Sequence, residues 1–459
     1  MIKIFPNNFI FFSLLLLIKF NPSFSQQEAT LHFMNSLPQV SYNNPAFFPR
    51  YKYSIGLPGS SVAASYSNNG FSYNDLAVKQ GDSVIVDLNK LHKALANNNY
   101  ITTTAQADIF RFSMKVTTRL YLTYNLTQKI YNREMLPKSL FGIFSEGTGT
   151  FVGDNVTISP QVETTAYLES ALGAGYKINK RLTLGMRFKL LKGEVNITTN
   201  KSTVNLAVGN NYELTATADI NAKTSGIHNL DSADYKFEDH WRDYLNNTGF
   251  GFDVGATYCF FDRLTVGLSL LDIGQIKWKN DLYGYSLDPA TANYTFEGIE
   301  LQEILNGNDQ YLQAQSDSLE KKFKFKQGRI RSYTTPLPSK IYLSGNYQIK
   351  RNFTAGVLFF AEKFRGRFSA GGTASLNKDF GRTFSASLSY TVAQQSFNNL
   401  GLGMSLNLAP IQLYLVSDHA LITDINNIKL FNIRVGMNIV FGWDKSEEKQ
   451  PFPSAKKEK

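Results

Sequence analysis

Residues 250–270, FGFDVGATYCFFDRLTVGLSL, decide the fold class of this chain. Apolar residues occupy alternate positions from Phe250 to Phe260, and mostly glycine or polar residues occupy the positions between them. Asp262-Arg263 then predicts a tight turn, after which the alternation resumes at Leu264. A period of two over about ten residues is typical of strands that face lipid on one side and a barrel lumen on the other. The stretch therefore predicts a transmembrane hairpin.

The same alternation recurs along the chain and is most regular in its last third, where the closing stretch runs from Phe431 to Phe441. Counting every candidate predicts about sixteen strands, and merging the weak pair 202–208 and 212–222 into its neighbours predicts about fourteen, within a range of about 12–16. We therefore expect an all-β fold, a transmembrane antiparallel β-barrel.

The connections between these strands alternate in length, as they do in bacterial outer-membrane barrels, where short turns lie on one side of the membrane. The predicted short turns are near 117–118, 179–180, 261–262, 350–352, 377–381 and 409–410. The predicted long connections are 127–163, 223–247, 272–338 and 418–430.

The alternative is a secreted β-sandwich or propeller, but the strands are long, charges mix with glycines on their polar face, and aromatic residues cluster near strand ends, which favours the barrel. Only 18% of the 459 residues are charged, below the roughly 25% of soluble domains, while 14% are aromatic. The single cysteine excludes an intramolecular disulfide framework and a cysteine-based zinc cluster. The net charge of +10 is not gathered into a basic, aromatic-interleaved domain, so we expect no nucleic-acid partner.

The N-terminus predicts export. Lys3 precedes an apolar run from Phe9 to Ile18, too short for the roughly 20 residues of a spanning helix. Small residues in Ser23-Phe24-Ser25 predict a signal peptide, residues 1–25, cleaved after Ser25. An uncleaved anchor is the alternative. With the barrel pattern, the signal predicts the cell outer membrane, with its lipid as a partner.

Three segments do not fit the wall of a barrel that spans 51–442. Residues 26–50 are extended and proline-rich, which predicts a periplasmic lead-in or a plug. Apolar residues at roughly helical spacing predict a helical insertion near 300–322. The charged tail, 443–459, is expected to be disordered and periplasmic.

Short motifs carry a family resemblance. Asn43-Asn44-Pro45-Ala46 follows the signal and leads into Tyr53–Pro58 and Asn69-Gly70-Phe71. A barrel with such a start resembles long-chain fatty-acid transporters (FadL-type) and the shuttle barrels of the type IX secretion system. With Leu271–Gly274, Lys277-Trp278 and Asn438–Gly442, the chain resembles still more an uncharacterised Bacteroidota family in that group. The resemblance implies an outer-membrane barrel and, less directly, transport of hydrophobic molecules.

Candidate ligand-binding residues lie on the lumen-facing positions. The basic ones could orient carboxylates, while Leu358 and Phe360 could line an apolar pocket. The alternative is that the charges are ion-paired with acids such as Glu169 and Asp253 and merely fill the interior. The basic candidates are Arg111, Lys115, Arg187 and Lys189.

No motif predicts catalysis, a metal or a cofactor. Glu238-Asp239-His240 is the densest acid and histidine cluster, but three consecutive side chains converge poorly on a metal. We therefore expect a non-enzyme: a transporter or channel for small molecules, hydrophobic ones included. The alternative is a non-catalytic scaffold or shuttle barrel that binds other envelope proteins in a secretion or surface-assembly machine.

Overall fold

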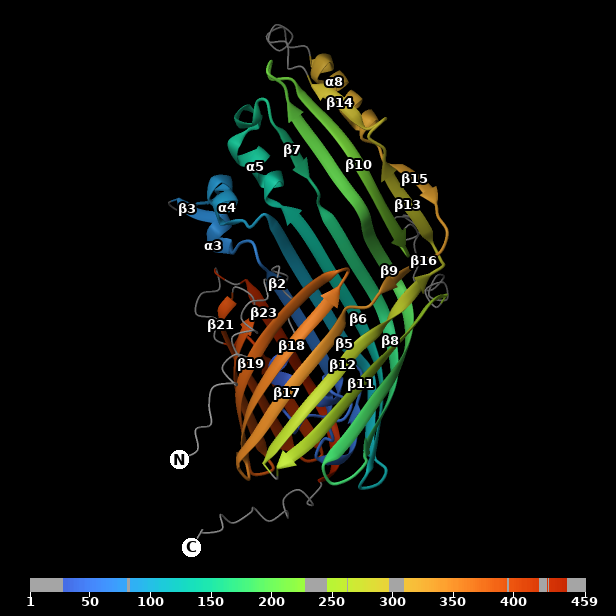
Figure 1. Cartoon of the computed structure of the whole chain (residues 1–459), viewed down its shortest axis with the longest axis vertical. Coiled ribbons are helices and arrows are strands. Elements are labelled where there is room, and N and C mark those ends of the chain that lie inside the picture. The colour runs from blue at the N-terminus through green and yellow to red at the C-terminus, as the bar shows by residue number, and fades with distance from the viewer. Residues whose placement is uncertain are drawn as a thin grey trace, which may run out of the picture.

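The computed structural model describes residues 28–80, 83–227, 246–261, 263–296, 309–393, 396–420, 427 and 429–443. They form a closed antiparallel β-barrel of 14 strands, which confirms the predicted fold class (Figure 1). The first wall strand consists of two pieces, β1 and β2, that both pair with the last strand, β23, and with β5. This double pairing closes the barrel and leaves no free edge in the wall.

The wall strands vary in length from seven to 27 residues. In order they are β1 (Tyr51–Gly56) with β2 (Ser61–Asn68), β5 (Asn98–Lys115), β6 (Leu120–Pro137), β8 (Gln161–Lys177), β9 (Leu182–Val208), β11 (Asn247–Phe261), β12 (Leu264–Trp278), β17 (Ser339–Lys350), β18 (Phe353–Phe364), β19 (Arg367–Phe380), β20 (Phe384–Ala393), β21 (Ser396–Leu408), β22 (Ile411–Ser417) and β23 (Leu430–Trp443).

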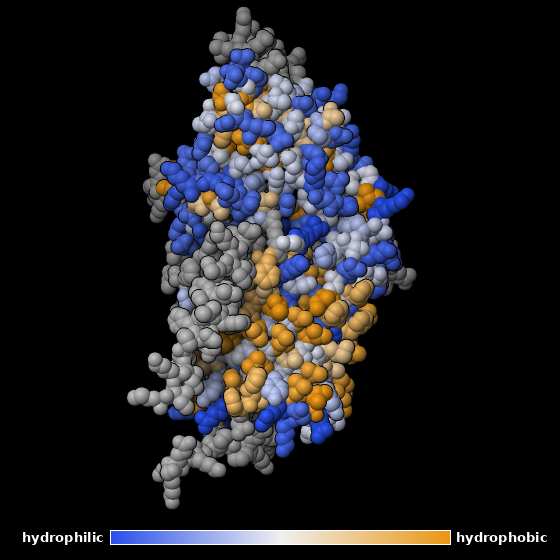
Figure 2. Space-filling view, in the orientation of Figure 1, coloured by the Kyte–Doolittle hydropathy of each residue, from blue (hydrophilic) through white to orange (hydrophobic). Residues whose placement is uncertain are grey.

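The outer face of the wall carries the predicted apolar side chains. Along β9, Leu184, Met186, Phe188 and Leu190 are 44 to 60% exposed, while Arg187 between them is 3% exposed. Figure 2 shows these apolar surfaces gathered over the lower part of the molecule, below a mostly hydrophilic upper part. Alternation along the strand therefore places apolar residues outside and polar residues in the lumen.

Above the wall, the sheet continues as a tall projection, here called the extension (Figure 1). The upper part of β9 pairs with β10, so the weak pair 202–208 and 212–222 belongs to the extension and not to the wall. The extension also contains short elements that pair with one another: β7 (Asn155–Ile158), β10 (Leu214–Ser225), β13 (Leu282–Leu287), β14 (Asn293–Phe296), β15 (Lys326–Arg329), β16 (Tyr333–Pro336) and helix α8 (Asp309–Lys322).

Two of the predicted long connections contain strands. The connection 127–163 is shorter than predicted, because β6 continues to Pro137 and β8 begins at Gln161. The 272–338 connection holds the end of β12 and four strands of the extension. Above the lipid-facing band neither face of a strand needs to be apolar, so the alternation that marks the wall disappears.

Small elements lie beside the rim where β2 and β5 leave the wall (Figure 1). They comprise α3 (Tyr73–Leu76), β3 (Ala77–Gln80), β4 (Ser83–Val86), α4 (Leu88–Ala94), α5 (Lys138–Glu146) and the 3-10 turn η2 (Thr148–Phe151). Among the described residues, no helix combines the length and the apolar character needed to cross a membrane.

Several predicted segments fall outside the described residues. These are the signal peptide 1–25, the Glu238-Asp239-His240 cluster and the tail after Trp443. Of the insertion predicted near 300–322, the described part, Asp309–Lys322, is the helix α8.

Candidate functional site

Residues 28–50, here called the plug, lie inside the lower half of the barrel (Figure 1). The plug contains helix α2 (Ala29–His32) and the 3-10 turn η1 (Pro38–Tyr42), and most of its side chains are buried. It follows that the lumen of this barrel is filled at this level by its own N-terminal segment.

The start of the plug is held by a carboxylate at the end of β22. Asp418 accepts hydrogen bonds from the backbone N–H groups of Ala29, at 3.1 Å, and Thr30, at 2.7 Å. The Thr30 hydroxyl also donates to Asp418, and the Asn432 amide donates to it at 2.6 Å. Asp418 is 2% exposed, so this bundle of hydrogen bonds is shielded from solvent.

The middle of the plug bonds to β21, β22 and β23 through amides and hydroxyls. Gln39 donates to Asn438 over 2.8 Å, and Gln412 donates to the Ser36 carbonyl over 2.9 Å. The hydroxyls of Ser36 and Ser405 are 3.2 Å apart. These neutral contacts position the plug beside a small apolar cluster, in which Leu31, Met34 and Leu37 of the plug pack with Tyr414 and Val416 of β22.

Asn44-Pro45, part of the motif that carries the resemblance, packs on glycines of the wall. A Cβ atom at Gly185 would lie 2.2 Å from the Pro45 carbonyl carbon, and one at Gly255 would lie 2.1 Å from Asn44 Oδ1. The Asn44 amide donates over 3.4 Å to the Ala256 carbonyl. Glycine is thus required at both wall positions for the close approach of the plug.

Leu358 and Phe360, two of the predicted ligand-binding residues, are covered by the plug. They are 1% and 6% exposed and pack in one cluster with Ala29 and Phe33. A ligand could therefore contact them only after the plug moved, and their role in binding remains a prediction.

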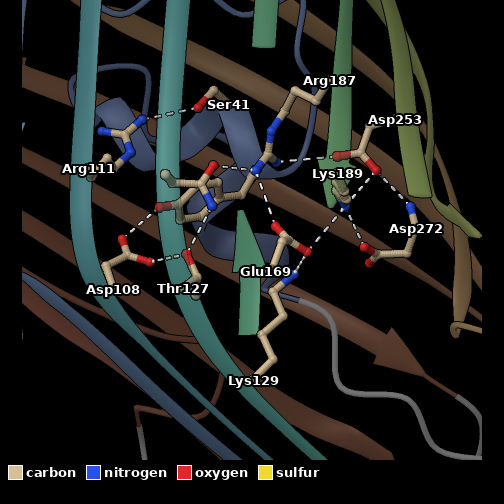
Figure 3. Close-up of polar contacts among 12 residues, drawn as sticks. Ser41, Asp108, Arg111, Thr127, Lys129, Glu169, Arg187, Lys189, Asp253 and Asp272 are labelled. Carbon is tan, nitrogen blue, oxygen red and sulfur yellow. Dashed lines mark hydrogen bonds and ion pairs between the residues drawn. The ribbon is translucent and has the colours of Figure 1, made fainter. Parts of the chain in front are cut away.

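Arg187 and Lys189, on β9, lie in a network of buried charges (Figure 3). Lys189 Nζ is 2.7 Å from Asp253 and 2.5 Å from Asp272, and Arg187 lies 3.3 Å from Asp253. Asp253 is fully buried on β11. Both bases are thus neutralised by acids on neighbouring strands.

Glu169 and two further lysines complete the network. Lys129 Nζ on β6 is 2.7 Å from Glu169, and Lys340 Nζ on β17 is 3.5 Å from Asp272. Arg187 and Lys189 also lie within 3.5 and 3.8 Å of Glu169. The network therefore bridges six strands of the wall, β6, β8, β9, β11, β12 and β17.

A cavity of about 140 Å³ lies against this network. Its lining combines charges of the network with hydroxyls of β5 and with aromatic residues, including Tyr42 of the plug. It is lined on the network side by Lys129, Glu169, Arg187, Lys189, Asp272 and Lys340. The plug thus forms part of the boundary of the cavity.

The two other predicted basic residues do not line this cavity. Arg111 donates to the Pro38 carbonyl and, over 3.1 Å, to the Ser41 hydroxyl, so it binds the plug. Lys115 is 8% exposed at the lower end of β5. Sequence reasoning missed Lys129 and Lys340, because both were assigned to the long connections or their margins rather than to wall strands.

No metal-binding arrangement is present in the part of the chain that the structure describes: no three His, Cys, Asp or Glu side chains are grouped to hold an ion. Cys259 is partly buried, and its thiol donates to the Phe261 carbonyl at 3.0 Å.

A sequence profile described as "Family of unknown function (DUF5723)" matches residues 45–418. No curated protein matches the sequence.

Solved barrels resemble the chain at low identity. The toluene transporter TodX of P. putida is 9% identical with a TM-score of 0.40, covering 92% of this chain and 96% of its own. A FadL homologue of Pseudomonas aeruginosa is 11% identical (TM-score 0.39), covering 90% and 96%. The translocator domain of autotransporter NalP from Neisseria meningitidis is 10% identical (TM-score 0.36), covering 90% and 97%. At these values the likenesses carry no weight for function.

Proposed function

Because the chain belongs to a family of unknown function, DUF5723, we propose its function from the wall, the plug and the cavity alone. The protein is an outer-membrane channel for small molecules, and residues 28–50 are its movable plug. Passage requires the plug to leave its place beside the cavity.

The apolar band supports the location. A closed wall whose outward side chains are apolar over consecutive strands needs a hydrocarbon environment, and closure satisfies every strand edge within it. Met186 on β9 and Leu172 on β8 are 60% and 62% exposed, which would be unfavourable in water for a whole ring of strands. The outer membrane, reached by a signal peptide, meets this need.

The observation that carries the proposal is the polar attachment of the plug. Its hydrogen bonds to Asn438 and Gln412 can be exchanged for water, so each contributes only about 0.5–1.5 kcal/mol, and those to the Asp418 carboxylate contribute about 1.5–3 kcal/mol each. A 14-strand barrel is wider than the eight-strand barrels that side chains alone fill. Moving the plug would open a path, at the further cost of exposing the two small apolar clusters that it forms with the wall.

The proposed substrates are small molecules and include hydrophobic ones. Leu358 and Phe360 would become accessible to an apolar solute once Ala29 and Phe33 of the plug moved away. Their exposure on opening is the feature that supports hydrophobic cargo.

Asp418→Asn tests the movable plug. Loss of the carboxylate weakens three hydrogen bonds to Ala29 and Thr30 and should destabilise the seated plug by about 1–3 kcal/mol. We expect faster swelling of proteoliposomes in isotonic arabinose than with the unchanged protein. Asp219→Asn, in an exposed ion pair of the extension, is the control and should leave swelling unchanged. Equal rates for Asp418→Asn and the unchanged protein would contradict the proposal.

A scaffold is the second candidate, and the extension favours it. The strands β10, β13, β14 and β15 add sheet beyond the wall that a channel does not need. If the protein is a scaffold, Asp418→Asn would not alter solute flux. The variant would still co-purify stably with another envelope protein.

A further inference from the structure

The charge network beside the cavity has one positive charge too many. Its ion pairs connect four cations with three anions, so one positive charge has no counterpart inside the network. The cations are Lys129, Arg187, Lys189 and Lys340, and the anions are Glu169, Asp253 and Asp272.

Other acids that line the cavity do not correct this imbalance. Glu28 of the plug is 2.6 Å from Arg434, and Glu362 of β18 is 3.4 Å from Arg133. Each of these acids is therefore matched by a base of its own. Among the described residues, the buried Asp108 and Arg111 also leave the balance unchanged, because both lie against Tyr42 and add one charge of each sign. An uncompensated charge that is only partly accessible to water is unfavourable, so the cavity favours the entry of one negative charge.

We infer that this cavity binds one small monoanion, such as a carboxylate, with Lys129 and Lys340 as its ligands; the inference rests on the proposed channel function and names its substrate class. These two amines are the accessible cations of the network. Their side chains are 20% and 30% exposed, whereas those of Arg187 and Lys189 are 4% and 2% exposed.

The two lysines also retain donors for a ligand. An ammonium group carries three N–H donors, and Lys129 and Lys340 each form an ion pair with a single acid of the network. Charge-assisted hydrogen bonds to a carboxylate are roughly twice as strong as neutral ones. Lys129 comes from β6 and Lys340 from β17, so a bound anion would join distant parts of the wall.

The remaining lining residues suit an anion whose uncharged part is small and compact. A cavity of about 140 Å³ is comparable to one of about 150 Å³ that accommodates benzene. Tyr42, Tyr167 and Tyr342 supply ring surface, and Thr102 and Thr104 supply hydroxyls. A monocarboxylate with a single ring matches this size and mixture of surfaces, and a long acyl chain does not.

The test compares three probes of nearly the same shape and different charge: benzoate, benzamide and benzamidine. Calorimetry on the purified full chain in detergent should show binding of benzoate, and affinities at least about tenfold lower for the neutral amide and the cation. Equal affinity for all three, or no binding of benzoate, would overturn the inference.

Variants locate the site. Lys129→Gln and Lys340→Gln should each weaken benzoate binding by about tenfold, because each removes a charged donor and restores neutrality to the network. Lys201→Gln, whose side chain is 58% exposed on the extension, should bind as the unchanged protein does. Unchanged affinity in both cavity variants would overturn the assignment. The comparison of benzoate, benzamide and benzamidine uses the unchanged protein, so it tests the inference even if a variant fails to fold.

Measurements of binding and of flux distinguish the anion site from the proposed channel function. Benzoate binding without benzoate flux into proteoliposomes would reject the channel and leave the anion site intact. Flux of arabinose without selective benzoate binding would support the channel and reject the anion site.

Discussion

Replacing Asp253 by alanine is expected to destabilise the barrel by about 3–5 kcal/mol, since removing one partner of a buried ion pair leaves an uncompensated charge. Asp253 is fully buried between Lys189, at 2.7 Å, and Arg187, at 3.3 Å. It also accepts a hydrogen bond from the Asp272 backbone N–H at 2.7 Å. Urea unfolding in lipid vesicles, followed by tryptophan fluorescence, measures the loss.

Two variants serve as controls for Asp253→Ala. Asp219→Ala removes an acid from an exposed pair and should change stability by no more than about 1 kcal/mol. The double variant Asp253→Asn/Lys189→Met removes one charge of each sign and should be less destabilised than Asp253→Ala alone. If Asp253→Ala lost no more stability than Asp219→Ala, the network would not be buried in the folded protein.

Met186→Arg is expected to prevent insertion into the membrane. Met186 lies at the centre of the outward apolar residues of β9 and is 60% exposed. An arginine on the lipid face near the bilayer midplane costs about 2–4 kcal/mol. The amount of heat-modifiable barrel in isolated outer membranes should fall sharply.

Matched substitutions separate the membrane effect from a general effect of arginine. Met186→Leu keeps the apolar surface and should insert normally. Phe325→Arg places the same cation on an aromatic position of the extension that is 46% exposed, and should also insert normally. Equal loss for Met186→Arg and Phe325→Arg would mean that the band on β9 does not face lipid.

The wall could be predicted from the sequence because lipid imposes a strict period of two. The Phe250–Phe260 stretch and the Phe431–Phe441 stretch became β11 and β23, since apolar side chains there must all face outward. The extension could not be predicted in the same way. Lys201 and Asp219 pair across β9 and β10 in a polar setting, where neither face requires apolar residues.

The charge network was only partly predictable. The alternation within each strand predicts that Arg187 and Asp253 face the lumen. It does not predict which charges on different strands lie close together. Asp272 was not recognised as a lumen-facing acid: the register of β11 and β12 shifts beside it, and its φ of 56° departs from the extended backbone. Lys129 escaped notice because it lies in a part of β6 that was assigned to a connection.

The N-terminal segment left a choice between a lead-in and a plug. Its prolines predict an irregular backbone but not its location. The contacts that hold it inside the barrel, such as those between Thr30 and Asp418, join residues 388 positions apart. Only the closed barrel brings the two ends of the chain together.

A reversible disulfide cross-link between the plug and the wall tests whether movement of the plug opens the channel. Ser36→Cys/Ser405→Cys, in a Cys259→Ser background, replaces two hydroxyls that lie 3.2 Å apart, one on the plug and one on β21. The measurement is the flux of arabinose and benzoate into proteoliposomes, before and after reduction of the cross-link. We predict that the oxidised protein gives no more flux than protein-free liposomes and that reduction restores the flux of the unlocked protein. Undiminished flux through the fully cross-linked protein, or no flux in either state, would contradict the account.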